Sequence, residues 1–200
     1  MLELVSGIFD LFNCIMRYIY SILFVVMLAG CGSGSGTDTR IFEALQKLDA
    51  GSMIVDIEID GKKFYPLDLP FKGSITINEL AFFVNLRNPE GGNIVISIED
   101  EDWYKAESKK IQFEEAMPLS GHLYGSLLVG RRTNTDGEGY LLKEGYFEIK
   151  QMNQEACIIT INGVLKNPFN DEITKPINGY IVWKKPPSLD PKTTGAYFFN

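Results

Sequence analysis

Residue types that carry out acid–base or metal chemistry are scarce in this chain of 200 residues. His122 is the only histidine, which excludes the multi-histidine zinc sites of metalloenzymes. The serine pattern G-x-S-x-G, a phosphate-binding P-loop and a C-x-x-C pair are all absent from the sequence. We therefore expect no catalytic residues and no cofactor, and the sequence predicts a protein that is not an enzyme.

Two acidic segments carry the oxygen ligands that calcium takes. Residues 99–102 place four carboxylates in a row, and Asn134, Asp136 and Glu138 alternate around Gly137. The second segment resembles the start of a calcium loop, but it lacks the distal bidentate glutamate at the required spacing. Solvated loops explain both segments, so no metal site is predicted, and Asn134, Asp136 and Glu138 stand as the calcium candidates.

Aromatic side chains on loops can stack on sugar rings. Trp103 and Tyr104 follow the acidic run directly, so we expect them on a loop, where they are the candidates for stacking on a ligand. Trp183 alternates with Ile181, which indicates a place on the core face of a strand.

The three cysteines cannot form a disulfide inside the body of the chain. Cys14 and Cys31 fall near the N-terminus, and Cys157 stands alone. Alternation places Cys157 on the same strand face as Ile159 and Ile161, which predicts a buried structural thiol.

Cys31 ends an apolar run that begins after Arg17, and it is preceded by Leu28, Ala29 and Gly30. A basic residue, an apolar stretch of about 7–15 residues and small residues before the cut are the parts of a signal peptide. The segment resembles the lipobox of bacterial lipoproteins, which the lipoprotein signal peptidase processes. The resemblance implies that Leu28, Ala29 and Gly30 are the peptidase recognition residues. It also implies that Cys31 carries a diacylglyceryl thioether and an N-acyl chain such as palmitate.

We therefore interpret residues 1–30 as a signal peptide, with Met16 as an alternative start. An uncleaved anchor is the main alternative, and a soluble secreted form is another. Spanning a bilayer takes about 20 apolar residues, whereas the run from Tyr18 to Gly30 stops at a Gly/Ser stretch. Two or three acyl chains would make attachment durable.

Residues 31–40 form the expected tether, because Gly32 begins the flexible sequence Gly-Ser-Gly-Ser-Gly. Such a linker has a root-mean-square reach of roughly 17 Å, which would hold the domain clear of the lipid headgroups. Gly32, rather than aspartate, follows Cys31, and in enteric-type sorting this favours the outer membrane. The expected location is the bacterial cell envelope, where lipid on Cys31 would attach the protein to the membrane.

Composition excludes one class of partner. Without residues 1–30 the chain has 24 acidic and 18 basic side chains. An acidic body argues against nucleic acid, because phosphate binding needs clustered lysine and arginine.

The body is predicted to be one all-β domain over residues 41–187. Asp38 or Thr39 is expected to cap a short N-terminal helix that Gly51 ends. Its apolar face would lie on a sheet through Ile41, Phe42, Leu45 and Leu48.

From Met53 the apolar period changes to two, and Asp60-Gly61 predicts a tight hairpin. Later strands are expected at 74–78, 82–86, 94–98, 109–113, 122–129, 146–151, 156–166 and 173–185. Nine or ten short strands with one helix indicate a mainly β fold, either an antiparallel β-sandwich or an open β-barrel. The pattern of residues 146–185 resembles small, uncharacterised all-β lipoproteins of gut Gram-negative anaerobes, a resemblance that implies no activity.

Residues 188–200 are expected to be a C-terminal tail, loose up to Thr194. The final aromatics from Tyr197 to Phe199 either tuck back as an edge strand or form an exposed docking tag. Our leading hypothesis is a lipid-anchored, non-enzymatic envelope domain that binds a partner protein or a glycan. The alternatives are an assembly accessory of an envelope complex, engaged through the helix or the tail, and thirdly an envelope hydrolase.

Overall fold

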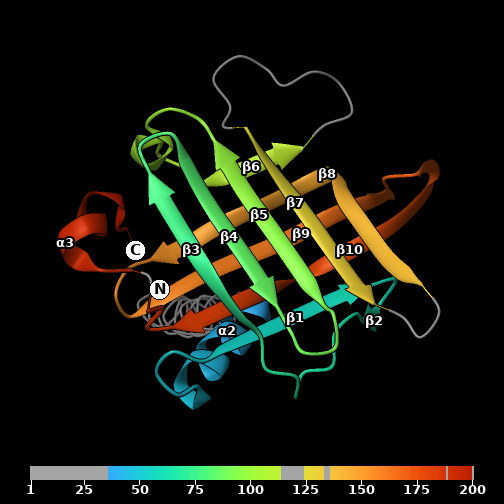
Figure 1. The fold of residues 1–200 in the computed structure, drawn as a ribbon, viewed down its shortest axis with the longest axis horizontal. Coiled ribbons are helices and arrows are strands. Elements are labelled where there is room, and N and C mark those ends of the chain that lie inside the picture. Colours follow the sequence, from blue (N-terminus) through green and yellow to red (C-terminus); the bar gives the residue numbers. More distant parts are fainter. Residues whose placement is uncertain (1–35, 114–123, 133–135, 188, 200) are drawn as a thin grey trace, which may run out of the picture. The chain divides into compact units, whose positions relative to one another are not determined.

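The computed structural model describes residues 36–113, 124–132, 136–187 and 189–199. Within these residues the chain is mainly β, which confirms the predicted fold class. One antiparallel sheet of ten strands runs in the order β2-β1-β10-β9-β8-β7-β5-β4-β3, and β6 pairs with β8 (Figure 1). The strands are β1 (Met53–Ile59), β2 (Lys62–Lys63), β3 (Lys72–Asn78), β4 (Ala81–Arg87), β5 (Asn93–Glu99), β6 (Lys110–Phe113), β7 (Gly125–Arg132), β8 (Gly137–Met152), β9 (Ala156–Asn167) and β10 (Asn170–Lys184).

The long strand β8 joins the two layers of this sheet. Its first part pairs with β7 from Gly137 to Leu141, and its later part pairs with β6 from Gly145 to Glu148. In Figure 1, β3, β4, β5 and β7 cross over β1, β9 and β10 at an angle. The path of the sheet ends at β2 and β3, so the sheet is open. An open sheet folded into two layers agrees with the predicted sandwich or open barrel.

Gly145 marks the point where β8 changes partner. Its φ is +101°, a conformation that side chains with a Cβ rarely adopt. A Cβ at this position would lie 2.3 Å from the carbonyl oxygen of Asn162 and 2.4 Å from the Cα of Gly163 on β9. The ladder between β8 and β9 is also irregular nearby, between Leu142 and Glu144. Two facing glycines therefore permit the close approach that the bend requires.

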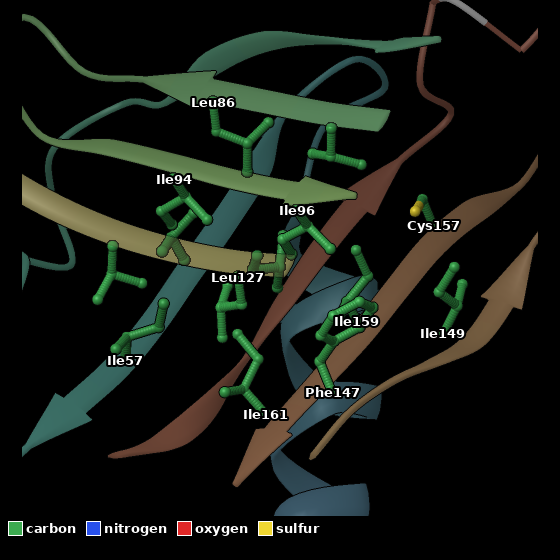
Figure 2. Packing of buried hydrophobic residues seen from close by; sticks show 14 of the residues in the cluster. Ile57, Leu86, Ile94, Ile96, Leu127, Phe147, Ile149, Cys157, Ile159 and Ile161 are labelled. Carbon is green, nitrogen blue, oxygen red and sulfur yellow. The ribbon is translucent and has the colours of Figure 1, made fainter. Parts of the chain in front are cut away.

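The main core lies between the two layers (Figure 2). Leu86, Ile94, Ile96 and Leu127 project from β4, β5 and β7 toward Ile57, Phe147, Ile159 and Ile161 of β1, β8 and β9. Burying each such side chain contributes about 1.5–3 kcal/mol. Cys157 and Trp183 belong to the same core, as predicted from their alternation. Burial raises the pKa of the Cys157 thiol to about 12, so it stays protonated at neutral pH.

Helix α2 (Gly36–Lys47) packs on the outer face of the sheet, as expected of a covering helix. Ile41 and Ala44 are buried against a second cluster built by Ala156, Ile158, Tyr180 and Val182 of β9 and β10. Three details of the prediction were wrong. The helix begins at Gly36, so residues 36–40 are helical and are not part of a flexible tether over 31–40. Asp38 and Thr39 lie inside the helix instead of capping it. Phe42 is 61% exposed, because the helical period puts residues 41, 44, 45 and 48 on the packed face.

No helix among the described residues is both long and apolar enough to cross a bilayer.

The C-terminal residues pack onto the domain, so the expectation of a loose segment up to Thr194 was wrong. Leu189 is buried, and the Asp190 side chain accepts a hydrogen bond from the backbone of Lys192 at the start of α3 (Pro191–Thr194). The short helix η2 (Gly195–Tyr197) follows. Phe199 then forms an antiparallel bridge with Met152 at the end of β8. The final aromatics therefore tuck back, which was one of the two predicted arrangements.

Candidate binding pocket

A pocket of about 340 Å³ opens where β4 and β7 end and β5 begins. It is called here the Arg131 pocket. Three stretches of chain that are distant in sequence build it: the segment after β2, the turn between β4 and β5, and the end of β7. The described residues that line it are Phe64, Tyr65, Pro66, Leu69, Asn88, Glu90, Gly92, Arg131 and Arg132.

Asn88 shapes the wall that the β4–β5 turn provides. Its side-chain oxygen accepts hydrogen bonds from the backbone of Glu90 at 3.1 Å and of Gly92 at 2.7 Å. Its backbone N–H donates to the Gly92 carbonyl at 2.9 Å. Gly91 adopts a φ of +84°, which a residue with a Cβ rarely tolerates. The sequence Asn-Pro-Glu-Gly-Gly therefore folds into a turn that its own first side chain holds.

Tyr65 fixes the second wall, the segment that crosses from β2 toward β3. Its hydroxyl oxygen accepts a hydrogen bond from the Gly130 N–H at 3.2 Å. The hydroxyl proton is shared between two acceptors, the Asn93 carbonyl at 2.8 Å and the Gly130 carbonyl at 3.0 Å. Its ring meets Phe64 and Phe71 edge-on, with centroids 4.8 and 5.0 Å apart. Burial raises the pKa of Tyr65, so the hydroxyl remains a donor. One phenol thus links the crossing segment to both β5 and β7.

Arg131 forms the third wall and is held from three sides. Its Nη1 donates to the Phe64 carbonyl at 2.9 Å, and its Nε donates to Glu138 at 2.9 Å. Its guanidinium carbon also lies 4.5 Å from the centroid of the Phe64 ring, a cation–π contact. Because an arginine held in this way has little freedom left, the pocket is formed before any ligand arrives.

Glu138 is the anion that organises this wall. Tyr140 donates to it at 2.7 Å and Lys175 at 3.1 Å, in addition to Arg131. Burial by itself would raise the pKa of the Glu138 carboxyl, but these hydrogen bonds outweigh burial, and the pKa is lowered. Glu138 is therefore ionised throughout the neutral range and serves a structural network.

The stacking candidates occupy a different end of the sheet. Trp103 begins the short helix η1 (Trp103–Lys105) and is fully buried, with its indole N–H donating to the Asn78 carbonyl at 3.0 Å. It stacks within the fold on Tyr197, with centroids 6.4 Å apart. The prediction of Trp103 as a ligand platform was therefore wrong, because the C-terminal residues cover it. Tyr104 is half-buried and contacts the edge of Tyr197, so its role stays a prediction.

The calcium candidates are not assembled into a site by the described residues. Asn134 lies outside the described residues, Asp136 is exposed, and Glu138 is engaged by Arg131 and two other partners. In the part of the chain that the structure describes, no group of three or more acidic, histidine or cysteine side chains could hold a metal ion. In the acidic run 99–102, Asp102 pairs with Lys105 at 2.8 Å.

The remaining predicted residues lie outside the described part of the chain. They are the lipidation residue Cys31 and the recognition residues Leu28, Ala29 and Gly30. The predictions made for them stay predictions.

Sequence reasoning missed the Arg131 pocket. Local signals were present, since residues 88–92 read Asn-Pro-Glu-Gly-Gly, a turn composition, and Arg131 and Arg132 stand side by side in the sequence. Nothing in a local pattern indicates that Tyr65 would reach the end of β7, 65 residues further along the chain.

The fold and the pocket together define an open all-β domain with a preformed pocket of arginine, amide and aromatic side chains. No family model, no curated protein and no solved structure matches this chain.

Proposed function

We propose that this chain is a lipid-anchored binding module of the bacterial envelope, non-enzymatic, which holds a ligand in the Arg131 pocket. The sequence supports the anchor through the lipobox ending at Cys31 and the Gly/Ser tether behind it. The domain that follows the tether would then meet ligands at a membrane surface. The two expected kinds of ligand are a glycan and a partner protein.

One observation carries the proposal: the pocket walls are held by hydrogen bonds within the protein itself. Asn88, Tyr65 and Glu138 each fix one wall. A site that is already in its binding shape avoids the entropy cost of ordering its side chains when a ligand arrives. This rigidity suits recognition.

The lining chemistry favours binding over hydrolysis. Glycosidases generally use two carboxylates that face each other across the scissile bond. Glu90 is the only acidic residue among the nine described residues that line the pocket. An envelope hydrolase therefore ranks below a binding module.

The accessory hypothesis is less favoured for a different reason. A docking tag must be free to reach its partner, whereas Phe199 exchanges two backbone hydrogen bonds with Met152 at 3.0 and 2.8 Å. Tyr197 also packs against Trp103. The tail is thus engaged within the domain.

Filling the pocket tests the proposal. Leu69 lines the pocket and is half-buried, while Leu67 lies on the same segment, is 54% exposed and is not among the lining residues. Wild type, Leu69→Trp and the matched control Leu67→Trp would be screened against an array of neutral and acidic glycans and of peptides. We expect at least one probe to bind wild type, and its affinity for Leu69→Trp to be about tenfold lower or more. Leu67→Trp should retain binding within about twofold.

Equal binding by Leu69→Trp and Leu67→Trp for every probe would contradict a role for the pocket. Circular dichroism and urea unfolding of both variants would establish that a loss of binding is not a loss of folding.

A further inference from the structure

Two charged groups at the mouth of the Arg131 pocket have no partner among the described residues. The guanidinium of Arg132 and the carboxylate of Glu90 are both exposed, and neither makes a side-chain hydrogen bond or an ion pair in the described part of the chain. The backbones that carry them are close in the fold, because the backbone N–H of Arg132 donates to the carbonyl of Gly91, the residue after Glu90, at 3.2 Å. Arg131 and Glu138, by contrast, are satisfied by each other.

We propose that the pocket takes an acidic sugar, a ring that bears one carboxylate and several hydroxyl groups, within a glycan. This inference rests on the proposed function, and it names the ligand class of the same pocket. Arg132 pairs with the sugar carboxylate, since its N–H groups match the two oxygens of a carboxylate. Glu90 accepts hydrogen bonds from the hydroxyl groups. The Asn88 side chain also lines the pocket and adds a further polar group to it.

The unpaired charges of Arg132 and Glu90 favour an acidic sugar over other kinds of ligand. A neutral sugar would leave Arg132 without an anion. An acidic peptide side chain brings a carboxylate to Arg132 but no hydroxyl group to Glu90, so it satisfies only one of the two charges. A sugar acid supplies both complements at once. The pocket volume of about 340 Å³ lies at the lower end of the range for small-molecule sites, which suits one ring better than an extended segment.

Apolar contact comes from the segment after β2. Pro66 and Leu69 of this segment line the pocket, together with the buried Phe64 and Tyr65. One face of a sugar ring carries mainly C–H groups, which pack against such a surface. The ring would therefore lie with its C–H face on this segment and its polar edge toward Arg132.

The test uses the full chain and three carboxylate-bearing probes: oligogalacturonate, oligomannuronate and a sialylated oligosaccharide. The methyl ester of oligogalacturonate is the uncharged counterpart, and poly-glutamate is the peptide counterpart. The variants are Arg132→Gln and Glu90→Ala. Arg87→Gln is the matched control, because Arg87 is exposed, lies near the same turn and does not line the pocket.

We expect at least one acidic sugar to bind wild type, and Arg132→Gln to weaken that binding by about tenfold or more, as loss of a charge-assisted hydrogen bond does. Glu90→Ala should weaken it by about threefold or more, and Arg87→Gln by less than about twofold. The methyl ester should bind wild type no better than the acid binds Arg132→Gln.

Failure of all three acidic sugars to bind wild type overturns the inference, as does equal binding by Arg132→Gln or tighter binding of poly-glutamate. These outcomes are separable from failure of the proposed function. If another probe still depends on the pocket, losing binding in Leu69→Trp but not in Leu67→Trp, the binding module stands and only the acidic sugar is rejected. If no probe depends on the pocket, both are rejected.

Discussion

At the scale of single residues, Glu138 connects the sheet to the pocket. It receives hydrogen bonds from Arg131 on β7, from Tyr140 on its own strand and from Lys175 on β10. These contacts outweigh burial and lower the pKa of the Glu138 carboxyl below its ordinary value of 4.5. A carboxyl with a lowered pKa in the folded state contributes stability above the unfolded value. That contribution is lost as the pH falls through the lower, folded value.

Glu138→Gln should therefore destabilise the domain by about 1–3 kcal/mol at pH 7, since it removes charge-assisted hydrogen bonds to Arg131 and Lys175. The difference from wild type should shrink as the pH falls below about 4.5, because Glu138 takes up a proton first in the unfolded chain and only at lower pH in the folded protein. Urea unfolding of both proteins over a series of pH values measures this difference. Glu144→Gln is the control, because Glu144 is 45% exposed and its oxygen lies 3.8 Å from Lys143. A difference that stays constant down to about pH 3 would count against the network.

At the scale of elements, the decisive feature is the bend of β8, where the strand stops pairing with β7 and starts pairing with β6. Gly145 and Gly163 face each other there, and backbone atoms fill the space that a side chain would need. The bend allows the two layers to pack against one shared core. It also leaves Glu138, on the first part of β8, beside Arg131.

Gly145→Ala should destabilise the domain by at least about 2 kcal/mol, because the new Cβ meets the Asn162 carbonyl and the φ of +101° is strained for alanine. Gly137→Ala on the same strand is the control, since a Cβ there meets nothing within 4 Å. Its free energy of unfolding should change by less than about 0.5 kcal/mol. Denaturant unfolding followed by tryptophan fluorescence measures both. Similar small effects for the two variants would show that the bend tolerates a side chain.

At this scale the sequence predicted strands where alternation was clean. β1, β5 and β9 lie within one residue of their expected bounds, and the turn at Asp60-Gly61 has the positive φ values of its hairpin type. β8 was predicted only over 146–151, because Gly139 and Gly145 look like breaks in a local pattern. Both are tolerated since the neighbouring strands supply hydrogen bonds across them.

The roles of single residues were harder to predict when their burial depended on residues far away in the sequence. Trp103 follows four acidic residues and was expected on a surface loop, but the C-terminal Tyr197 covers it. The Arg131 pocket depends on Tyr65, whose partners are set by how the layers fold together. Pairings of this kind are tertiary, and a periodicity carries no information about them.

At the scale of the whole molecule, the proposed function combines a location, the membrane surface, with a binding site, the Arg131 pocket. In this proposal the pocket decides what chemistry can be recognised, and the proposed lipid on Cys31 would decide which ligands the domain meets. The five residues from Cys31 to the start of α2, with a reach of roughly 12 Å if flexible, would let the domain turn above the membrane. Without the anchor, the same pocket would face different ligands, so anchoring is the central claim.

Metabolic labelling with radioactive palmitate tests that claim most directly. The full chain would be expressed in a Gram-negative host as wild type, as Cys31→Ala and as the control Cys14→Ala, and then recovered from the membrane fraction. We predict label in wild type and in Cys14→Ala, none in Cys31→Ala, and a mature chain that begins at Cys31. Equal label in wild type and Cys31→Ala, or no label in wild type, would contradict a lipid-anchored module.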